Sequence, residues 1–158
     1  MALWTVYLSL GLLVALNASV ETRPVGGKPC SACETGWTAY GCRCFKFFKD
    51  PQYSWGGGED TCLSYGGNLA SVHSHAEYMF IQNLIRQTTH ASTPVWIGGH
   101  NPVYTYWFWS DGTRMNYKIW SPGQPSYSKD EHCLEMNSVH GNWNDVKCNE
   151  SKSFVCVK

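Results

Sequence analysis

This sequence has no excess of charge of either sign. Its 158 residues contain 12 Lys and Arg against 12 Asp and Glu, so the formal net charge is zero. Nucleic-acid-binding proteins attract phosphates through basic patches, and this balance gives no support for a nucleic-acid partner. The sequence also lacks a basic amphipathic stretch of the kind that binds membrane surfaces.

Long hydrophobic runs are also scarce, and the one that is present lies at the N-terminus. Residues 1–18, MALWTVYLSLGLLVALNA, carry no charged side chain and end in small residues. This pattern predicts a signal peptide, and hence a secreted, extracellular protein with no membrane insertion. An uncleaved anchor is the alternative, because the run is near the lower length limit for spanning. Residues 19–32 are then a polar N-terminal lead-in, and residues 33–158 form one domain.

Cysteine, in contrast, is abundant: all eight cysteines follow the apolar run. An even number behind a secretory leader indicates disulfide bonds. Zinc ligation by Cys30-x2-Cys33 and Cys42-x-Cys44 is the alternative, but the spacing departs from the usual finger patterns and an oxidising route disfavours free thiolates. Spacing alone does not choose among the possible pairings.

Local patterns predict a mixture of helices and short strands. Residues 36–48 alternate aromatic and polar side chains across a glycine, which predicts a hairpin. Helices are expected over residues 54–65 and from Ser74, where Ser74-x-x-Glu77 fits a capping box. Strands are expected at 95–99, within 104–112 and at 153–158, whereas 116–147 is predicted to be mostly loop.

Polar oxygens gather in that predicted loop. The candidates are Gln124, Ser126, Glu131, Asn144 and Asp145, and calcium prefers six to eight oxygens from carboxylates, amides, hydroxyls and water. A disulfide between Cys133 and Cys148 would hold Glu131 beside the Asn-Asp pair and contribute about 3 kcal/mol by closing the loop. A solvated polar loop is the alternative interpretation.

The ordered motifs of the chain resemble the C-type lectin domain over about residues 33–157. The resemblance is carried by Cys33-x3-Trp37-x6-Cys44, Gly67-Asn68-Leu69-Ala70-Ser71-Val72, Trp96-Ile97-Gly98-Gly99, Trp109-Ser110-Asp111-Gly112, Glu131-x-Cys133 and Trp143-Asn144-Asp145-x2-Cys148. In length, the chain is similar to the small secreted lectins of fish, which are relatives of the type II antifreeze proteins. The resemblance implies an α+β fold with two helices, small antiparallel sheets and a long disulfide-tied calcium-binding loop.

The resemblance also implies specific pairs and ligands. It implies the disulfides Cys33–Cys44, Cys62–Cys156 and Cys133–Cys148, and it leaves Cys30 and Cys42 either to pair with each other or to link two chains. It implies Ca²⁺ as cofactor, held around a cis-proline at Pro125 by Gln124, Ser126, Glu131, Asn144 and Asp145. These residues would also bind sugar hydroxyls, with Tyr127 as a platform for the sugar.

The motif Gln124-Pro125-Ser126 bears on which sugar is bound. Gln-Pro-Asp in this family favours galactose-type sugars and Glu-Pro-Asn favours mannose-type sugars, so Gln124 indicates galactose, whereas Ser126 fits neither pattern. Because Ser lacks the charge of Asp, a weaker calcium site is expected.

The predicted function is calcium-dependent recognition of glycans on microbial or cell surfaces by a secreted lectin, with an innate-defence role and a possible homo-oligomer. No nucleophile motif or acid–base pair stands out, so enzyme activity is not predicted. The alternative is a C-type lectin-like protein that does not bind sugar, either similar to type II antifreeze proteins or a venom component that binds proteins.

Overall fold

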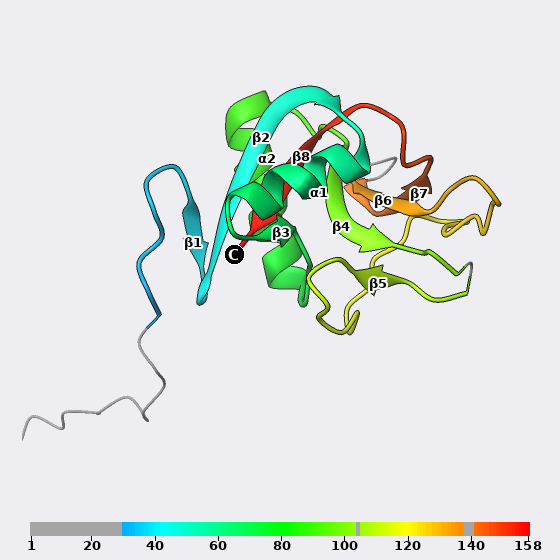
Figure 1. Cartoon of the computed structure of the whole chain (residues 1–158), viewed down its shortest axis with the longest axis horizontal. Helices are drawn as coiled ribbons and strands as arrows, with labels where there is room; N and C mark the ends of the chain where they lie inside the picture. Colours follow the sequence, from blue (N-terminus) through cyan, green and yellow to red (C-terminus); the bar gives the residue numbers. More distant parts are fainter. Residues whose placement is uncertain (1–29, 104, 138–140) are drawn as a thin grey trace, which may run out of the picture.

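The computed structural model describes residues 30–103, 105–137 and 141–158 (Figure 1). The predicted signal peptide, and the lead-in up to residue 29, lie outside the described residues. Two helices and eight strands follow one another along the described chain, which is the α+β composition that the sequence predicts. Within these three ranges, neither helix is long and apolar enough to cross a bilayer.

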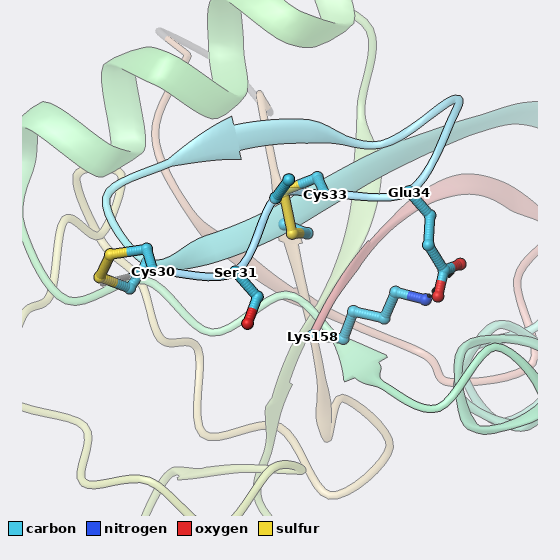
Figure 2. Close-up of a pocket in the computed structure, with 8 residues that line it drawn as sticks. Cys30, Ser31, Cys33, Glu34 and Lys158 are labelled. Carbon is cyan, nitrogen blue, oxygen red and sulfur yellow. Dashed lines mark hydrogen bonds and ion pairs between the residues drawn. A yellow bond between two sulfur atoms is a disulfide. The ribbon is translucent and has the colours of Figure 1, made fainter. Parts of the chain in front are cut away.

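The N-terminal part of the described chain forms the predicted hairpin. Strand β1, Thr38–Tyr40, pairs antiparallel with β2, Arg43–Tyr53, and Gly41 takes the left-handed conformation between them (φ 58°). Two disulfides, Cys30–Cys42 and Cys33–Cys44, tie the preceding segment to this hairpin. Figure 2 shows both disulfides beside the ion pair between Lys158 and Glu34. Of the two alternatives for Cys30 and Cys42, the structure therefore has the bond within one chain.

Helix α1, Trp55–Ser64, begins and ends where the sequence places its signals. The Ser54 hydroxyl accepts a hydrogen bond from the Gly57 N–H at 3.2 Å and caps the first turn. Gly66, in the left-handed conformation (φ 78°), follows the last turn. The buried Cys62 joins this helix to Cys156 on the last strand, so the helix is covalently tied to the sheet.

Helix α2, His75–Thr89, has only half of the predicted capping box. The Ser74 hydroxyl accepts the Glu77 N–H at 3.1 Å, but the Glu77 carboxylate does not bond back to Ser74. It accepts the His73 N–H at 2.7 Å and pairs with Arg43 at 2.6 Å instead. Tertiary contacts with strand β2 therefore replace the reciprocal bond that a local pattern predicts.

The strands form one connected sheet rather than several separate ones. Its order is β1-β2-β8-β4-β6-β7, with β3 and β5 pairing at β8 and β4. The remaining strands are β3 (Asn68–Leu69), β4 (Val95–His100), β5 (Phe108–Trp109), β6 (Cys133–Met136), β7 (Asn144–Val146) and β8 (Lys152–Val157). The pair β4–β8 is parallel, and the other strand pairs are antiparallel. Strands β6 and β7 lie at the end of the molecule away from β1 (Figure 1).

Residues 116–147 are mostly irregular, as predicted, but two short strands that were not predicted lie in their second half. Strands β6 and β7 lie there and pair antiparallel, with Leu134 opposite Asp145. All four residues of β6 are buried, so the strand has no alternation of polar and apolar side chains to reveal it. The irregular segment is therefore shorter, and its second half is fixed to the sheet.

Buried tryptophans fill the space beneath the irregular segment. Trp143 is fully buried, and its ring meets those of Trp109 and Trp120 edge to face, at centroid distances of 5.5 and 5.9 Å. Its backbone N–H donates to the carbonyl of Ile119 at 2.9 Å, and its own carbonyl accepts from Ser121 at 2.8 Å. Trp143 thereby fixes the position of the two polar residues that follow it, Asn144 and Asp145.

Candidate functional site

The five predicted ligand residues come from two segments that meet at the edge of the sheet. Gln124 and Ser126 flank a cis peptide bond at Pro125, which is the conformation that the resemblance implies. The backbone N–H of Ser126 donates to Asp145 Oδ1 at 2.8 Å. A direct hydrogen bond therefore joins the irregular segment to strand β7.

A single hydroxyl lies between the two carboxylates of the site. Ser126 Oγ is 2.6 Å from Glu131 Oε2 and 3.1 Å from Asp145 Oδ2. A hydroxyl has one hydrogen to donate, so it satisfies only one of these acceptors at a time. The other carboxylate oxygen is left facing a second negative group, and this arrangement favours a cation.

Asp145 is a buried carboxylate without a positively charged partner among the described residues. The residue is 1% exposed, and no Lys, Arg or His within the described ranges forms an ion pair with it. Burying a carboxylate is costly unless it is paired with a positive group or bound to a metal. The Ser126 N–H and hydroxyl offset part of this cost but supply no positive charge.

Asn144 is oriented by a residue that the sequence reasoning missed. Its Nδ2 donates to Glu135 Oε1 at 3.1 Å, and Glu135 in turn pairs with Lys152 at 2.9 Å. With the nitrogen held by Glu135, the amide oxygen of Asn144 is buried and has no hydrogen-bond partner among the described residues. The signal in the sequence was a charged residue inside the apolar run Cys133–Met136.

Lys152 shares in fixing this arrangement. Burial acts to lower the pKa of Lys152, but hydrogen bonds and charge from Glu150 and Glu135 outweigh it and raise that pKa above its ordinary value. The ammonium group therefore stays charged at neutral pH and neutralises the carboxylate of Glu135. Glu135 is thus free to act as an acceptor for Asn144.

Gln124 supplies a second amide oxygen in the same state. Its Oε1 is buried and has no hydrogen-bond partner within the described part of the chain. Two unpartnered amide oxygens, two carboxylates and one hydroxyl make an oxygen-only donor set, and hard cations such as Ca²⁺ prefer such a set. These residues therefore fit a calcium ion chemically. The described residues contain no group of three or more His, Cys, Asp or Glu that could hold a metal, and amide oxygens make up the difference here.

A disulfide fixes the two segments at their base. Cys133 and Cys148 are bonded, with their Cα atoms 5.1 Å apart. Glu131 precedes the first cysteine by two residues, and Asp145 precedes the second by three. The bond holds the two carboxylates together whether or not a cation is present. It is one of the three pairs that the resemblance implies; the structure also contains Cys33–Cys44 and Cys62–Cys156.

Tyr127 stands beside the site with its ring in solvent. Its side chain is 65% exposed, and its backbone has a positive φ of 53°. Such a conformation is unfavourable for a bulky residue and commonly marks a functional position. The exposed ring is available as an apolar surface next to Ser126.

A second polar cluster brings a serine, a histidine and an aspartate together, and its serine is buried. Ser71 Oγ donates to Asp111 and lies 3.2 Å from His73 Nε2, yet Ser71 is fully buried. Burial acts to raise the pKa of Asp111, but hydrogen bonds from Ser71 and Thr113, with the charge of Arg43, hold it below its usual value. The cluster ties β2 to the segment after β5 through Arg43, Ser71 and Asp111.

A hollow of about 450 Å³ lies at the N-terminal end, remote from the five residues. Figure 2 shows its walls: the two N-terminal disulfides and the paired side chains of Glu34 and Lys158. Its cysteines are oxidised and its charged groups neutralise each other, so it offers little chemistry for a ligand.

Comparison with known proteins is consistent with the fold. Residues 51–158 match the family described as the lectin C-type domain. The chain is 40% identical over 157 residues to the galactose-specific lectin nattectin of Thalassophryne nattereri, covering 98% of this chain and 95% of nattectin.

Two solved structures with similar folds differ in their relation to calcium. A Ca²⁺-dependent type II antifreeze protein in its Ca²⁺-free form has a TM-score of 0.74 at 37% identity, covering 80% of this chain and 99% of the other. A calcium-independent type II antifreeze protein has a TM-score of 0.73 at 34% identity, covering 80% and 94%. Similarity of fold therefore leaves the use of calcium to be argued from the site residues.

Proposed function

This chain belongs to the C-type lectin family, and we propose that it is a secreted, calcium-dependent lectin for galactose-type sugars. The single observation that supports this most directly is the convergence of Glu131 and the buried Asp145 on the hydroxyl of Ser126. Such a set is electrostatically incomplete without a cation. In this proposal the protein binds its sugar, and no bond is made or broken.

In the proposed site, Gln124, Ser126, Glu131, Asn144 and Asp145 hold Ca²⁺ and bind the sugar. Calcium, when bound, supplies coordination positions for two neighbouring sugar hydroxyls. The carboxylates of Glu131 and Asp145 accept hydrogen bonds from those hydroxyls, and the amides of Gln124 and Asn144 donate to them. Lys152 and Glu135 keep Asn144 in its orientation.

The preference for galactose rests on Gln124 and Tyr127. Gln124 is the residue expected for galactose-type sugars in this family, and nattectin is named galactose-specific. The exposed ring of Tyr127 provides an apolar surface for the apolar face of galactose. Ser126 contributes a neutral oxygen, so the site carries only two negative charges and calcium is held less tightly than by three.

Single-site affinity is expected to be low, so useful binding requires several sites at once. A homo-oligomer facing glycans on a microbial or cell surface raises the effective concentration by multivalency. A host-defence role in the extracellular space is the corresponding biological proposal, and it rests on family analogy.

Affinity chromatography on immobilised galactose tests the proposal. The protein should be retained in calcium and released by EDTA, and Glu131→Gln should abolish retention. Asp60→Asn is the matched control, because Asp60 is an exposed carboxylate on α1, and it should behave as the unmodified protein. Retention that EDTA does not disturb, or no retention with an unchanged melting temperature in calcium, would refute the proposal and favour an antifreeze-like or protein-binding member of the family.

A further inference from the structure

A groove of about 440 Å³ opens beside the proposed calcium site and shares Tyr127 with the proposed sugar-binding surface. Pro125 and Tyr127, on either side of Ser126, line one part of it, and residues 105–108, 112–115, 118 and 120 complete it. None of the five proposed calcium ligands lines the groove. It is therefore a separate surface that a molecule bound at the calcium site can reach.

The groove gathers exposed aromatic rings. Tyr106 is 65% exposed, Phe108 46% and Tyr127 65%, and all three line it. Large apolar side chains this exposed and this close together indicate a binding surface rather than chance exposure. Flat aromatic faces bearing hydroxyls suit the ring of a saccharide, which presents C–H groups on one face and polar groups at its edge.

The charge of the groove is positive, although the whole chain is neutral. Arg114 and Lys118 line it and are exposed, and its described lining contains no Asp or Glu. Neither forms an ion pair with a carboxylate in the described part of the chain. The nearest acidic residue in sequence, Asp111, accepts from Ser71 and Thr113 and lies 3.8 Å from Arg43 instead. Two unneutralised cations beside aromatic rings favour an anionic ligand.

The wall of the groove is built on the same framework as the calcium site. Trp120 lines the groove, forms a β-bridge with Trp143 and packs against Trp107 at a centroid distance of 4.9 Å. Trp143 directly precedes Asn144 and Asp145. Packed tryptophan rings therefore fix the position of the groove relative to the proposed calcium site.

We propose that this groove binds an anionic group, a sulfate or a carboxylate, carried by a galactose-terminated glycan whose terminal sugar occupies the calcium site. This inference rests on the proposed function. Arg114 and Lys118 bind the anion, while Tyr106, Phe108 and Tyr127 contact the saccharide that bears it. The protein thus distinguishes acidic from neutral galactosides.

Competition for galactose beads in calcium, with matched soluble sugars, tests this. Galactose 6-sulfate is compared with galactose for the sulfate, and lactobionate with lactitol for the carboxylate. Two exposed ion pairs give an expected preference of about three- to tenfold for at least one acidic sugar. That preference should be present at about 0.01 M salt, where the Debye length is about 30 Å, and lost at about 1 M salt, where it is about 3 Å.

Variants assign the effect to the groove. Arg114→Gln combined with Lys118→Gln should reduce the acidic-to-neutral ratio to about one. Arg86→Gln combined with Lys49→Gln removes the same charge from exposed positions outside the groove and should leave the ratio unchanged.

Each unfavourable result has a distinct meaning. Galactose binding that requires calcium but shows a ratio of one for both sugar pairs overturns this inference and leaves the proposed function standing. Acidic sugars that bind equally well in EDTA overturn it as well, because the anion then binds by charge alone. Absence of any calcium-dependent binding overturns both proposals.

Discussion

Replacing Ser126 by Asp should lower stability without calcium and enlarge the stabilisation that calcium supplies. Ser126 Oγ lies 2.6 Å from one oxygen of Glu131 and 3.1 Å from one oxygen of Asp145. A carboxylate in its place brings three negative groups together. It also removes the Ser126 hydroxyl, which lies within hydrogen-bond distance of both Glu131 and Asp145. The effect of the substitution therefore depends on whether a cation is present to neutralise them.

The size of the effect follows from these distances. Two like charges about 4 Å apart repel by about 1 kcal/mol in water and by about 4 kcal/mol at an effective dielectric constant of 20. Two new pairs at this exposed position therefore cost about 2 kcal/mol or more without calcium. In a domain of this size, 1 kcal/mol corresponds to about 2–4 °C in melting temperature. The variant should melt about 4–8 °C below the unmodified protein in EDTA.

Calcium should recover much of this loss. A third charged ligand should tighten calcium binding at least tenfold, which is about 1.4 kcal/mol at saturating calcium. The calcium-induced rise in melting temperature should therefore be at least about 3–6 °C larger in Ser126→Asp than in the unmodified protein.

Thermal melts in EDTA and in excess calcium measure both effects. Ser31→Asp is the matched control, since Ser31 is exposed at the N-terminal hollow remote from the site and gains the same charge. Retention on galactose beads should strengthen in Ser126→Asp as well. Equal melting shifts in EDTA and calcium, or the same behaviour in Ser31→Asp, would refute the role assigned to Ser126.

Three further predictions concern the frame that positions the site. Gly98→Ala should destabilise the fold by about 1–3 kcal/mol in urea unfolding, because the new Cβ would lie 2.5 Å from the backbone oxygen of Leu69. Gly56→Ala should instead stabilise α1 by about 0.5–1 kcal/mol, because a Cβ at Gly56 would meet no atom within 4 Å among the described residues. Burial and the charge of Tyr117 raise the pKa of Tyr78 to about 12, although a hydrogen bond from Gln82 acts to lower it. The free energy of unfolding should therefore be unaffected below about pH 10 and fall by about 3 kcal/mol as the pH rises to 12. This loss should be absent in Tyr78→Phe, and an equal loss in that variant would contradict the prediction. The lowered pKa of Asp111 should give stability that is present above its ordinary pKa of about 3.9 and lost as the pH falls through the lower folded-state value; Asp111→Asn should show a shallower acid transition by circular dichroism, and an unchanged one would argue against the assignment.

Local sequence signals predict the parts of the fold that local forces determine. The start of the first helix near Ser54, the cap at Ser74 and the hairpin at Gly41 agree with the structure. Each depends on hydrogen bonds or backbone conformations within a few residues, and such interactions are readable from a short window of sequence. The final strand also agrees, although its partners are distant in sequence.

Strands β6 and β7 were not predicted because long-range pairing creates them. β6 is buried between β4 and β7, and its sequence, CLEM, has neither alternation nor length to separate it from a loop. The single connected sheet also follows from the parallel pairing of β4 with β8, which joins residues more than fifty positions apart and leaves no local signal.

Within the candidate site, the five oxygen donors could be named from sequence, whereas the residues that hold them could not. The positions of Gln124, Ser126 and Asp145 follow a recognisable motif. The chain from Lys152 through Glu135 to Asn144 crosses three strands, and its spacing in sequence carries no pattern. The groove was missed for the same reason, because its aromatic and basic residues come from several turns that only the folded chain brings together.

The two halves of the site differ in how they are anchored. Asn144 and Asp145 begin strand β7 behind a fully buried tryptophan, so any substitution that moves them must also disturb the hydrophobic core. Gln124, Ser126 and Tyr127 lie in an irregular segment outside the regular strands, where side chains can be exchanged without repacking the interior. Half of the recognition surface is therefore constrained by folding and the other half is free to diversify. On such a frame, new ligand preferences can arise from two or three substitutions around Pro125 while the opposite donors stay in place.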